Sequence, residues 1–270
     1  MHIKKATLIT AEIHILQSKL LGREVTLSVY YPSLNDTMHK MEMLLINDGQ
    51  DLETMNFESI LSGLYSNKEM RPLFFAGISC GADRRNEYGT AKVLDYAGRG
   101  NKAALYQQFI FDELLPFIEI NYAFVSFKEK SFCGFSLGGL SALDIVWNHP
   151  EEFKNVGVFS GSLWWRSVSQ DDPLFDEQND RIMHAQIRNG NYYPWLKFFF
   201  ETGTMDETAD RNKNGIIDSI DDTITLIDEL VKKGYRDQED ILYMELKDGK
   251  HDVPTWGKAF PYFLRWRWGK

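Results

Sequence analysis

Apolar residues fall along this chain in two kinds of short run, which predict two kinds of β-strand. Residues 6–15 and 25–31 alternate apolar and polar side chains, as in strands with one covered face and one solvated face. Residues 43–46 and 73–75 are apolar on both faces, which is typical of central strands in a sheet covered on both sides. Further strands are expected at residues 73–78, 130–133, 156–159, 196–201 and 241–246.

Helical stretches lie between the later strands. They are expected at residues 57–66, 103–121, 137–148, 222–233 and 255–265. Strands that alternate with helices predict an α/β sandwich of about eight strands, mostly parallel, with helices on both faces and an antiparallel edge. A chain of 270 residues with 43% hydrophobic content can bury one large core, so residues 1–270 are expected to form a single domain.

One long segment, residues 166–194, fits neither a sheet strand nor a core helix. It begins where a strand end should meet the active site of such a fold. Two interpretations are open: a short lid or specificity loop, and an ordinary surface insertion.

Charge and apolar content limit the partners. A formal net charge of −9 without a dense basic cluster argues against a protein that tracks nucleic-acid phosphates. No apolar run approaches the length that spans a bilayer, so no membrane partner is expected. The chain is expected to be cytoplasmic, although a removed signal peptide would leave no trace. Cys80 and Cys133 are expected to be free thiols.

The segment 130–141 carries the strongest chemical signal. It reads as a strand that runs through Gly134-Phe135-Ser136-Leu137-Gly138 directly into a helix, a G-x-S-x-G nucleophile elbow of the α/β-hydrolase kind. A serine hydroxyl is a poor nucleophile unless a tight turn holds it beside a base, and the glycines leave room for that turn. Ser136 is therefore the candidate nucleophile.

Active sites in parallel sheets lie beyond the carboxyl ends of the strands. After residues 43–46 comes a glycine turn, residues 47–51, where an α/β-hydrolase places part of its oxyanion hole. The backbone N–H groups of Gln50 and Leu137 are the expected donors to the oxyanion. An ordinary type I or II turn explains the loop equally well.

Two later loops supply an acid and a base. Asp206 follows the strand at 196–201 and is the first choice for the acid, with Glu207 and Asp210 as alternatives. His251 lies in a glycine turn after the last predicted strand. The order Ser136, Asp206, His251 is the one this fold uses. His251 would take the serine proton, Asp206 would orient the imidazole, and water would resolve an acyl-enzyme.

Seven ordered segments resemble one known family, the esterases of the esterase D and enterochelin-esterase type within the α/β-hydrolases. The resemblance covers nearly the whole chain and implies hydrolysis of a small-molecule carboxylic ester through Ser136, His251 and an acid near Asp206. It leaves the substrate open. The segments are residues 47–50, 84–88 (R-x-x-E-Y), 111–118 (E-L-L-P-x-I), 134–139, 149–153, 160–165 (S-G-S-x-W-W) and 251–256.

Three residues in these segments are candidates for substrate binding. Trp164 and Trp165 offer broad apolar faces for an acyl or aryl pocket, and the more economical expectation is that one is in the core and only one faces the site. Arg85 either contacts substrate or pairs with Glu87 to brace the entrance loop, and we favour the brace.

Residues 210–221 fit the twelve-residue calcium-loop pattern. The glycine falls at position six, and Asp221 replaces the usual glutamate at position twelve. No cofactor is expected for catalysis, so a bound Ca²⁺ would be structural. The alternative is an acidic solvated loop. The predicted ligands are Asp210, Asn212, Asn214, Asp218, Asp221 and the carbonyl oxygen of Ile216.

The sequence favours a serine esterase and leaves two other functions open. An acyltransferase would use the same three residues and differ only in whether an alcohol or water resolves the acyl-enzyme. A calcium-dependent binding module with a defunct site is disfavoured, because the elbow, acid and histidine are all present. The oligomeric state cannot be read from the sequence.

Overall fold

The computed structural model describes residues 8–33 and 39–270, so residues 6 and 7 of the first expected strand lie outside the described residues. Eight strands in this part of the chain form one sheet in the order β1-β2-β4-β3-β5-β6-β7-β8. The strands are β1 Ile9–Ser18, β2 Arg23–Pro32, β3 His39–Asn47, β4 Leu73–Ile78, β5 Val125–Phe135, β6 Phe153–Phe159, β7 Lys197–Met205 and β8 Ile241–Lys250. β1 and β2 are antiparallel to their neighbours, and all later pairs are parallel. The predicted α/β fold is confirmed.

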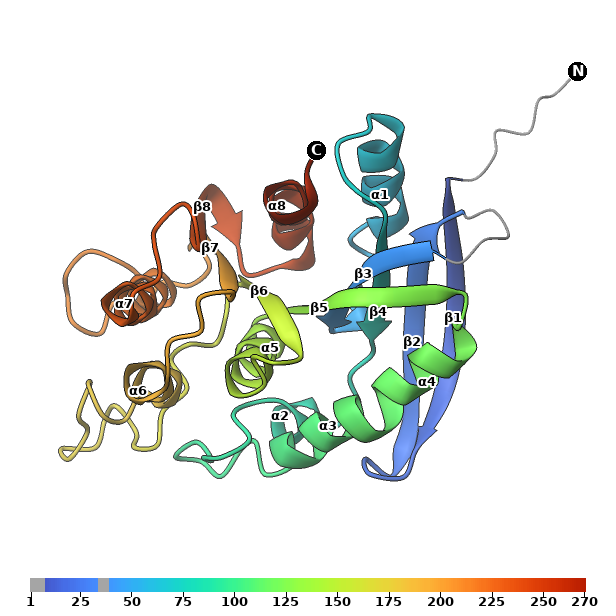
Figure 1. The fold of residues 1–270 in the computed structure, drawn as a ribbon. Coiled ribbons are helices and arrows are strands. Elements are labelled where there is room, and N and C mark those ends of the chain that lie inside the picture. The colour runs from blue at the N-terminus through green and yellow to red at the C-terminus, as the bar shows by residue number, and fades with distance from the viewer. Residues whose placement is uncertain (1–7, 34–38) are drawn as a thin grey trace, which may run out of the picture.

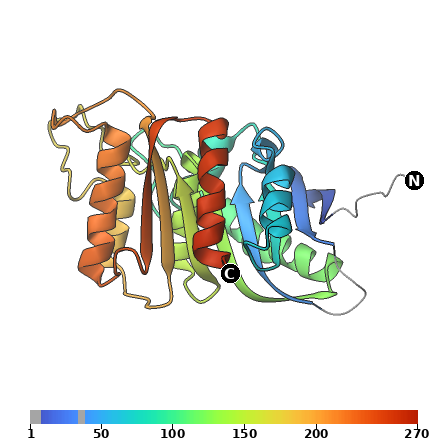
Figure 2. The same ribbon diagram turned by 90° about the horizontal axis from the view of Figure 1, so that it is seen from above.

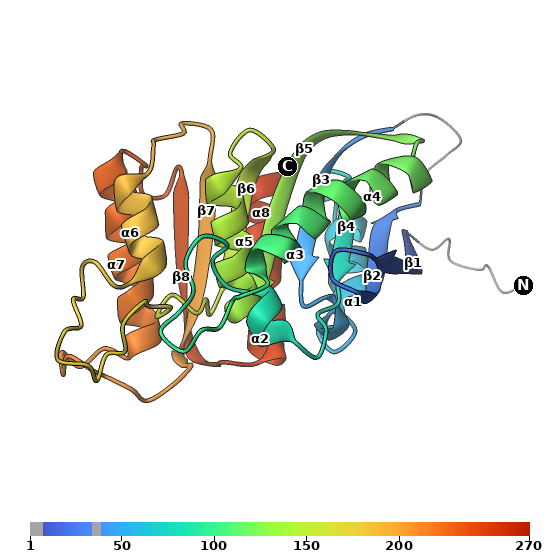
Figure 3. The ribbon, with the colours of Figure 1, turned by 90° about the horizontal axis from the view of Figure 1, so that it is seen from below.

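Helices cover both faces of this sheet (Figure 1). α1 and α8 lie on one face, as the view from above shows (Figure 2). α3, α4, α5 and α6 cross the opposite face in the view from below (Figure 3), and α7 packs on that face beside α6. The helical segments are η1 Gly49–Asp51, α1 Phe57–Ser66, α2 Arg84–Glu87, α3 Ala103–Phe109, η2 Ile110–Leu114, α4 Leu115–Asn121, α5 Leu137–Asn148, α6 Ile182–Asn189, α7 Asp218–Lys233 and α8 Val253–Trp268.

Aromatic packing beneath α8 fixes the strand that ends at the elbow. Phe135, the last residue of β5, stacks on Trp256 with ring centroids 5.1 Å apart. Phe159, the last residue of β6, stacks on Phe260 at 5.2 Å. These phenylalanines are almost completely buried, and each contributes roughly 1.5–3 kcal/mol of hydrophobic stabilisation. The start of α8 is therefore locked to the strand ends that carry the site.

The interpretation of residues 166–194 as a segment outside the core is wrong for its second half. That half contains α6, whose Ile182, Met183 and Ile187 are buried in the core. The ring of His184 also bonds to the carbonyl oxygen of Asp222 in α7, at 2.9 Å. Residues 167–181 and 190–194 lack a strand or helix. The start of the segment lies beside the loop at 90–100, where the Tyr96 N–H donates to the Arg166 carbonyl.

Two smaller expectations are also addressed by the structure. Cys80 and Cys133 are both free thiols, as predicted, with Cys133 buried and Cys80 partly exposed. The helices of the described residues include none with the length and apolar content needed to cross a bilayer.

Candidate active site

Strand register brings the predicted acid and base to one place. Met205 at the end of β7 pairs with Lys250 at the end of β8, so Asp206 and His251 each follow a paired residue by one position. Ser136 follows β5, which is separated from β7 only by β6. Parallel strands end at the same edge of a sheet, so all three candidate residues lie at the carboxyl edge.

Ser136 sits on a strained turn between β5 and α5. Its φ of 54° and ψ of −123° lie outside the regions that non-glycine residues favour, at a cost of about 1–3 kcal/mol. Its N–H donates to the Phe159 carbonyl at 2.8 Å, which holds the turn. A Cβ atom at Gly134 would meet the Gly138 carbonyl oxygen at 2.4 Å, so the strand and helix approach closely only because this residue is glycine.

Asp206 and His251 interact electrostatically. Burial lowers the pKa of the His251 imidazole, the Asp206 carboxylate raises it, and the Arg84 guanidinium lowers it. Burial raises the pKa of the Asp206 carboxyl, while the nearby Ser160 hydroxyl and His251 lower it. Both Asp206 oxygens are buried and accept no well-formed hydrogen bond in the described part of the chain. Protein atoms surround much of the His251 imidazole, yet the residue as a whole keeps solvent-exposed surface.

A second carboxyl lies behind this pair. Glu201 in β7 is 1% exposed, and neither of its oxygens has a hydrogen-bond partner among the described residues. Burial, together with the charge of Asp206, raises its pKa to about 8. Ser160 lies beside both carboxyls and accepts a 3.0 Å hydrogen bond from the Trp256 indole. Sequence reasoning placed Glu201 inside the strand and gave it no role.

The Ser136 hydroxyl lies 3.5 Å from the Ser162 hydroxyl, and Ser162 also donates its N–H to the Ser136 carbonyl at 3.1 Å. Within residues 8–33 and 39–270, no hydrogen bond joins Ser136 to His251. Catalytic hydrogen bonds of this type are commonly long without substrate and tighten when it binds. The structure therefore brings the predicted base and acid together and leaves the serine–histidine contact to be made.

The expected oxyanion donors occupy helix starts. Leu137 is the first residue of α5 and Gln50 lies in the short η1 turn, and N–H groups at such positions have no partner within their helix. Two hydrogen bonds tie the loop before η1 to the elbow: the Asn47 amide donates to the Gly138 carbonyl at 2.8 Å, and the Tyr106 hydroxyl donates to Asn47 at 2.5 Å. This anchoring supports, but does not test, the oxyanion assignment.

Arg84 is a site residue that sequence reasoning missed. Its guanidinium forms two 2.7 Å hydrogen bonds with the buried carboxylate of Asp48 and a third, at 3.3 Å, with the Phe135 carbonyl. The suggested Arg85–Glu87 brace is wrong, because Glu87 pairs instead with Arg23, at 2.6 Å. Arg85 is exposed and forms no ion pair with a described residue. The R-x-x-E-Y spacing places the motif arginine at Arg84, so this signal could have selected Arg84 over Arg85.

The two tryptophans of the S-G-S-x-W-W segment have different environments, as expected: one is in the core and the other lines a cavity. Trp165 is completely buried and lies over Gly89, where a Cβ atom would meet its ring at 2.8 Å, so it is a core residue and does not line a pocket. Trp164 lines a cavity of about 280 Å³, beside Tyr96, Arg99 and Arg166.

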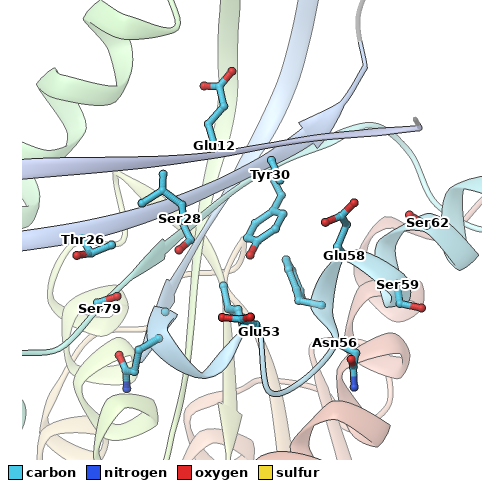
Figure 4. A pocket seen from close by; sticks show the side chains of 16 residues that line it. Glu12, Thr26, Ser28, Tyr30, Glu53, Asn56, Glu58, Ser59, Ser62 and Ser79 are labelled. Carbon is cyan, nitrogen blue, oxygen red and sulfur yellow. The ribbon is translucent and has the colours of Figure 1, made fainter. Parts of the chain in front are cut away.

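A cavity larger than the one beside Trp164 lies elsewhere. It has a volume of about 1070 Å³ and opens between β1, β2 and α1, where Figure 4 shows Tyr30, Glu53 and Glu58 around it. Gln50 is the only candidate site residue among those that line it, and Ser136, Asp206 and His251 do not. Volume alone therefore does not identify the active site in this fold.

Residues 210–217 form a loop and residues 218–221 are the first turn of α7, and polar side chains of the two parts are joined by hydrogen bonds. The Asp210 carboxylate accepts from the N–H groups of Asn214 and Gly215, and the Asn214 amide donates to Asp221 at 3.0 Å. Gly215 has a φ of +85°, as the sharp turn at position six requires. Arg211 also contacts Asp218 and Asp221. Over the described residues, no group of three or more His, Cys, Asp or Glu side chains is arranged to hold a metal ion. The Ca²⁺ assignment, which also uses amide and carbonyl oxygens, stays a prediction.

Comparison with known proteins identifies the family. The family model described as "Putative esterase" matches residues 18–266. The chain belongs to this esterase family. Its activity is therefore that of a carboxylic ester hydrolase. A curated relative, the "Uncharacterized protein YjcH" of Bacillus subtilis (strain 168), is 24% identical over 245 residues, which are 88% of this chain and 89% of the relative.

Solved structures of similar fold include an enterobactin esterase and a siderophore hydrolase. The enterobactin esterase FES of Shigella flexneri, crystallised with enterobactin, matches with a TM-score of 0.72 at 21% identity, over 97% of this chain and 59% of that chain. The siderophore hydrolase EstB of Aspergillus nidulans matches with a TM-score of 0.67 at 15% identity, over 98% of this chain and 96% of that chain. This esterase thus spans about three fifths of FES, and at these identities the likeness shows the α/β-hydrolase fold alone.

Proposed function

We propose that this esterase is a serine hydrolase that cleaves its ester through an acyl-enzyme, with Ser136 as nucleophile, His251 as base and Asp206 as the residue that orients His251. The observation that carries the proposal is the electrostatic pairing of Asp206 with His251 at the sheet edge where the Ser136 elbow lies. A strained nucleophile turn beside an acid–imidazole pair is the arrangement that acyl transfer needs.

The proposed steps follow from these positions. His251 accepts the Ser136 proton as the serine oxygen bonds to the ester carbonyl carbon, and the carbonyl electron pair moves to its oxygen. The N–H groups of Gln50 and Leu137 stabilise that oxyanion. The carbon–oxygen bond to the alcohol then breaks as His251 returns the proton to the leaving group. Water, deprotonated by His251, attacks the acyl-enzyme and releases the carboxylic acid.

Asp206 supports the base in two ways. Its negative charge stabilises the imidazolium that forms during each proton transfer, and a hydrogen bond to the ring would set the tautomer. Both of its buried oxygens are free to accept that bond. Glu207 and Asp210, the alternatives to Asp206, do not contribute to the charge interactions that shift the pKa of His251, so Asp206 is the better candidate.

The substrate is proposed to be a small-molecule ester. The named substrates of the solved relatives make siderophore lactones a reasonable first arm of a substrate panel, beside aryl and acetyl esters. Purified enzyme is expected to hydrolyse at least one of these, and Ser136→Ala to abolish that activity. Product analysis with an added alcohol separates hydrolysis from acyl transfer, because a transferase would give the transesterified product in preference to the free acid.

We also propose that residues 210–221 bind a structural Ca²⁺. Support comes from the convergence of the side chains at positions one, three, five and twelve of the loop, which are joined by hydrogen bonds between Asp210, Asn212, Asn214 and Asp221. These oxygen donors suit a hard cation. The ion would take no part in the chemistry. It would hold the segment that follows Asp206.

A further inference from the structure

Two arginines stand apart from the rest of the chain. All other arginines in residues 8–33 and 39–270 have a carboxylate within 4.0 Å, whereas Arg85 and Arg166 have none. Arg85 is exposed, so water solvates its charge. Arg166 is only 4% exposed. A buried guanidinium without a counter-ion is costly, which makes Arg166 the unusual member of the pair.

The contacts of Arg166 use only part of its hydrogen-bonding capacity. Its Nε donates to the Trp164 carbonyl and its Nη1 to the Gln170 side chain, both at 2.6 Å. The guanidinium also lies 5.4 Å from the centre of the Phe175 ring. These partners are neutral. Since arginine has five N–H donors, three remain for a ligand. Burial lowers the pKa of this guanidinium, and a bound anion would compensate for that lost hydration.

Arg166 lines the 280 Å³ cavity beside Trp164 and Tyr96. Arg99 completes this wall: it stacks on Trp164 at 5.0 Å, and its own charge is neutralised by Asp95. Tyr96 and Trp164 therefore give the cavity aromatic surface, and Arg166 gives it a positive charge without a counter-ion.

Three acidic residues also line the cavity, and their charges are either paired or solvated. Asp218 is neutralised by Arg211 at 3.1 Å. Asp171 and Glu207 are exposed at the rim, where water and salt screen them. Among the charged groups that act on Arg166, Asp222 and Glu177 are themselves bonded to Arg211 and Arg181. Arg166 thus has no carboxylate of its own.

The cavity adjoins the proposed active site on two sides. Trp164 and Arg166 follow Ser162, whose hydroxyl lies 3.5 Å from that of Ser136. Four residues of extended chain span at most about 14 Å, so Arg166 is within reach of a substrate bound at Ser136. Glu207, which also lines the cavity, follows Asp206 directly. Ser136, Asp206 and His251 do not themselves line the cavity, so a substrate group must extend away from Ser136 to enter it.

We propose that this cavity is a subsite for a carboxylate carried by the substrate, with Arg166 as the specificity-determining residue. The free N–H donors of its guanidinium suit the two oxygens of a carboxylate. The substrate class is then an ester with a second, ionised acid group. This inference rests on the proposed esterase function and adds its preferred substrate.

The test compares length-matched neutral and anionic esters. One arm places the carboxylate on the acyl side, with mono-4-nitrophenyl glutarate against 4-nitrophenyl valerate. The other places it on the alcohol side, with 3-acetoxybenzoate against phenyl acetate. In at least one arm, the wild type is expected to favour the anionic ester at least tenfold in kcat/KM. In Arg166→Gln this ratio of kcat/KM values is expected to fall to near one. Arg166→Lys keeps the positive charge but loses the two-pronged guanidinium, so its ratio is expected to lie between those of the wild type and Arg166→Gln.

Arg71→Gln is the matched control, because Arg71 precedes β4 and so lies at the amino edge of the sheet, away from the proposed site, and it is expected to keep the wild-type ratio. Calorimetric titration of glutarate and of 3-hydroxybenzoate into Ser136→Ala gives a readout that needs no catalysis. At least one is expected to bind, and to bind at least tenfold more weakly when Arg166→Gln is added. An equal preference for both esters in both arms, a ratio unchanged in Arg166→Gln, or binding unaffected by it would overturn the subsite, even if Ser136-dependent hydrolysis of neutral esters stands.

Discussion

The guanidinium of Arg84 holds the carboxylate of Asp48 through two parallel hydrogen bonds of 2.7 Å. The pair joins α2 to the loop that follows β3, and a third bond from Arg84 reaches the Phe135 carbonyl, next to Ser136. Asp48 is 1% exposed and adopts a left-handed conformation, with a φ of 59°. One ion pair thus connects the proposed oxyanion loop to the nucleophile elbow.

Arg84→Met is therefore expected to destabilise the protein by about 3 kcal/mol, because it leaves the buried Asp48 carboxylate without a charged partner. It should also lower kcat more than it raises KM, since the Gln50 donor loses its anchoring. Denaturant unfolding and ester kinetics measure both effects. Arg85→Met, which alters an exposed and unpaired neighbour, is the control. Equal stability of the two variants would show that the ion pair does not hold the loop.

The pH dependence of kcat/KM should report His251. The imidazole must be neutral to accept the serine proton, and its pKa lies below the usual 6.5 because burial disfavours the charged ring. Activity is thus expected to persist below pH 6.5 and to fall only as the pH drops through the lowered pKa. An acidic limb above pH 7 would contradict this assignment.

Asp206→Asn should shift the acidic limb of the kcat/KM profile to lower pH, because it removes the carboxylate that raises the pKa of His251. The rate at pH 8 is expected to fall by on the order of 10⁴-fold, because the imidazole loses the group that sets its tautomer and stabilises the imidazolium. Asp210→Asn, an alternative acid, is the matched control and should keep the wild-type limb. If Asp210→Asn instead of Asp206→Asn shows the fall in rate, Asp210 is the acid that orients His251.

Glu201 should make stability depend on pH. Its pKa is raised to about 8 in the folded protein from an ordinary 4.5, so the folded state binds this proton more tightly than the unfolded state. Its contribution is fully present below pH 4.5 and is lost as the pH rises to about 8, by a few kcal/mol at most. Glu201→Gln is expected to remove this loss of stability at high pH. The variant should therefore have a higher Tm than the wild type at pH 9 and the same Tm at pH 4.5.

Glu119→Gln provides the comparison for that experiment, because Glu119 is exposed on α4. Its melting curve should follow the wild type across the pH range. A Glu201→Gln variant that shows the same pH dependence as wild type would mean that Glu201 is ionised in the folded state.

Chelation tests the proposed calcium loop. A ligand at one hundred times its Kd stabilises a protein by about 2.7 kcal/mol, so excess chelator should lower the Tm by several degrees, and added Ca²⁺ should restore it. Asp210→Ala removes the position-one ligand, whose side-chain hydrogen bonds stay within the loop, and should make the Tm insensitive to chelator. Unchanged melting of the wild type and no heat on calcium titration would leave residues 210–221 as a solvated acidic loop.

The sequence predicted this fold well wherever local pattern determines structure. The bounds of α1, β4 and α5 match the expected residues, because apolar runs and the glycine-framed turn mark them directly. α6 was missed, since its apolar residues are few and its burial comes from contact with α7, far along the chain. Pattern says little about a short helix that depends on such a partner.

The candidate site shows the same division. Chain order was enough to choose Asp206 and His251, which strand pairing then places side by side. It could not separate Trp164 from Trp165, because neighbouring residues of one type differ only in the direction that the folded backbone gives them. The spacing of the R-x-x-E-Y motif, by contrast, already distinguishes Arg84 from Arg85. The unpaired state of Arg166 likewise depends on which carboxylates other segments bring near it.

The most direct test of the central claim is covalent labelling of Ser136 by a fluorinated phosphonate, mapped by mass spectrometry and measured beside ester hydrolysis. The account predicts a single label on Ser136 in the wild type, with activity lost in proportion to labelling, and neither label nor activity in a folded Ser136→Ala variant. Hydrolysis that survives in Ser136→Ala, or a label that maps to another residue, would contradict it.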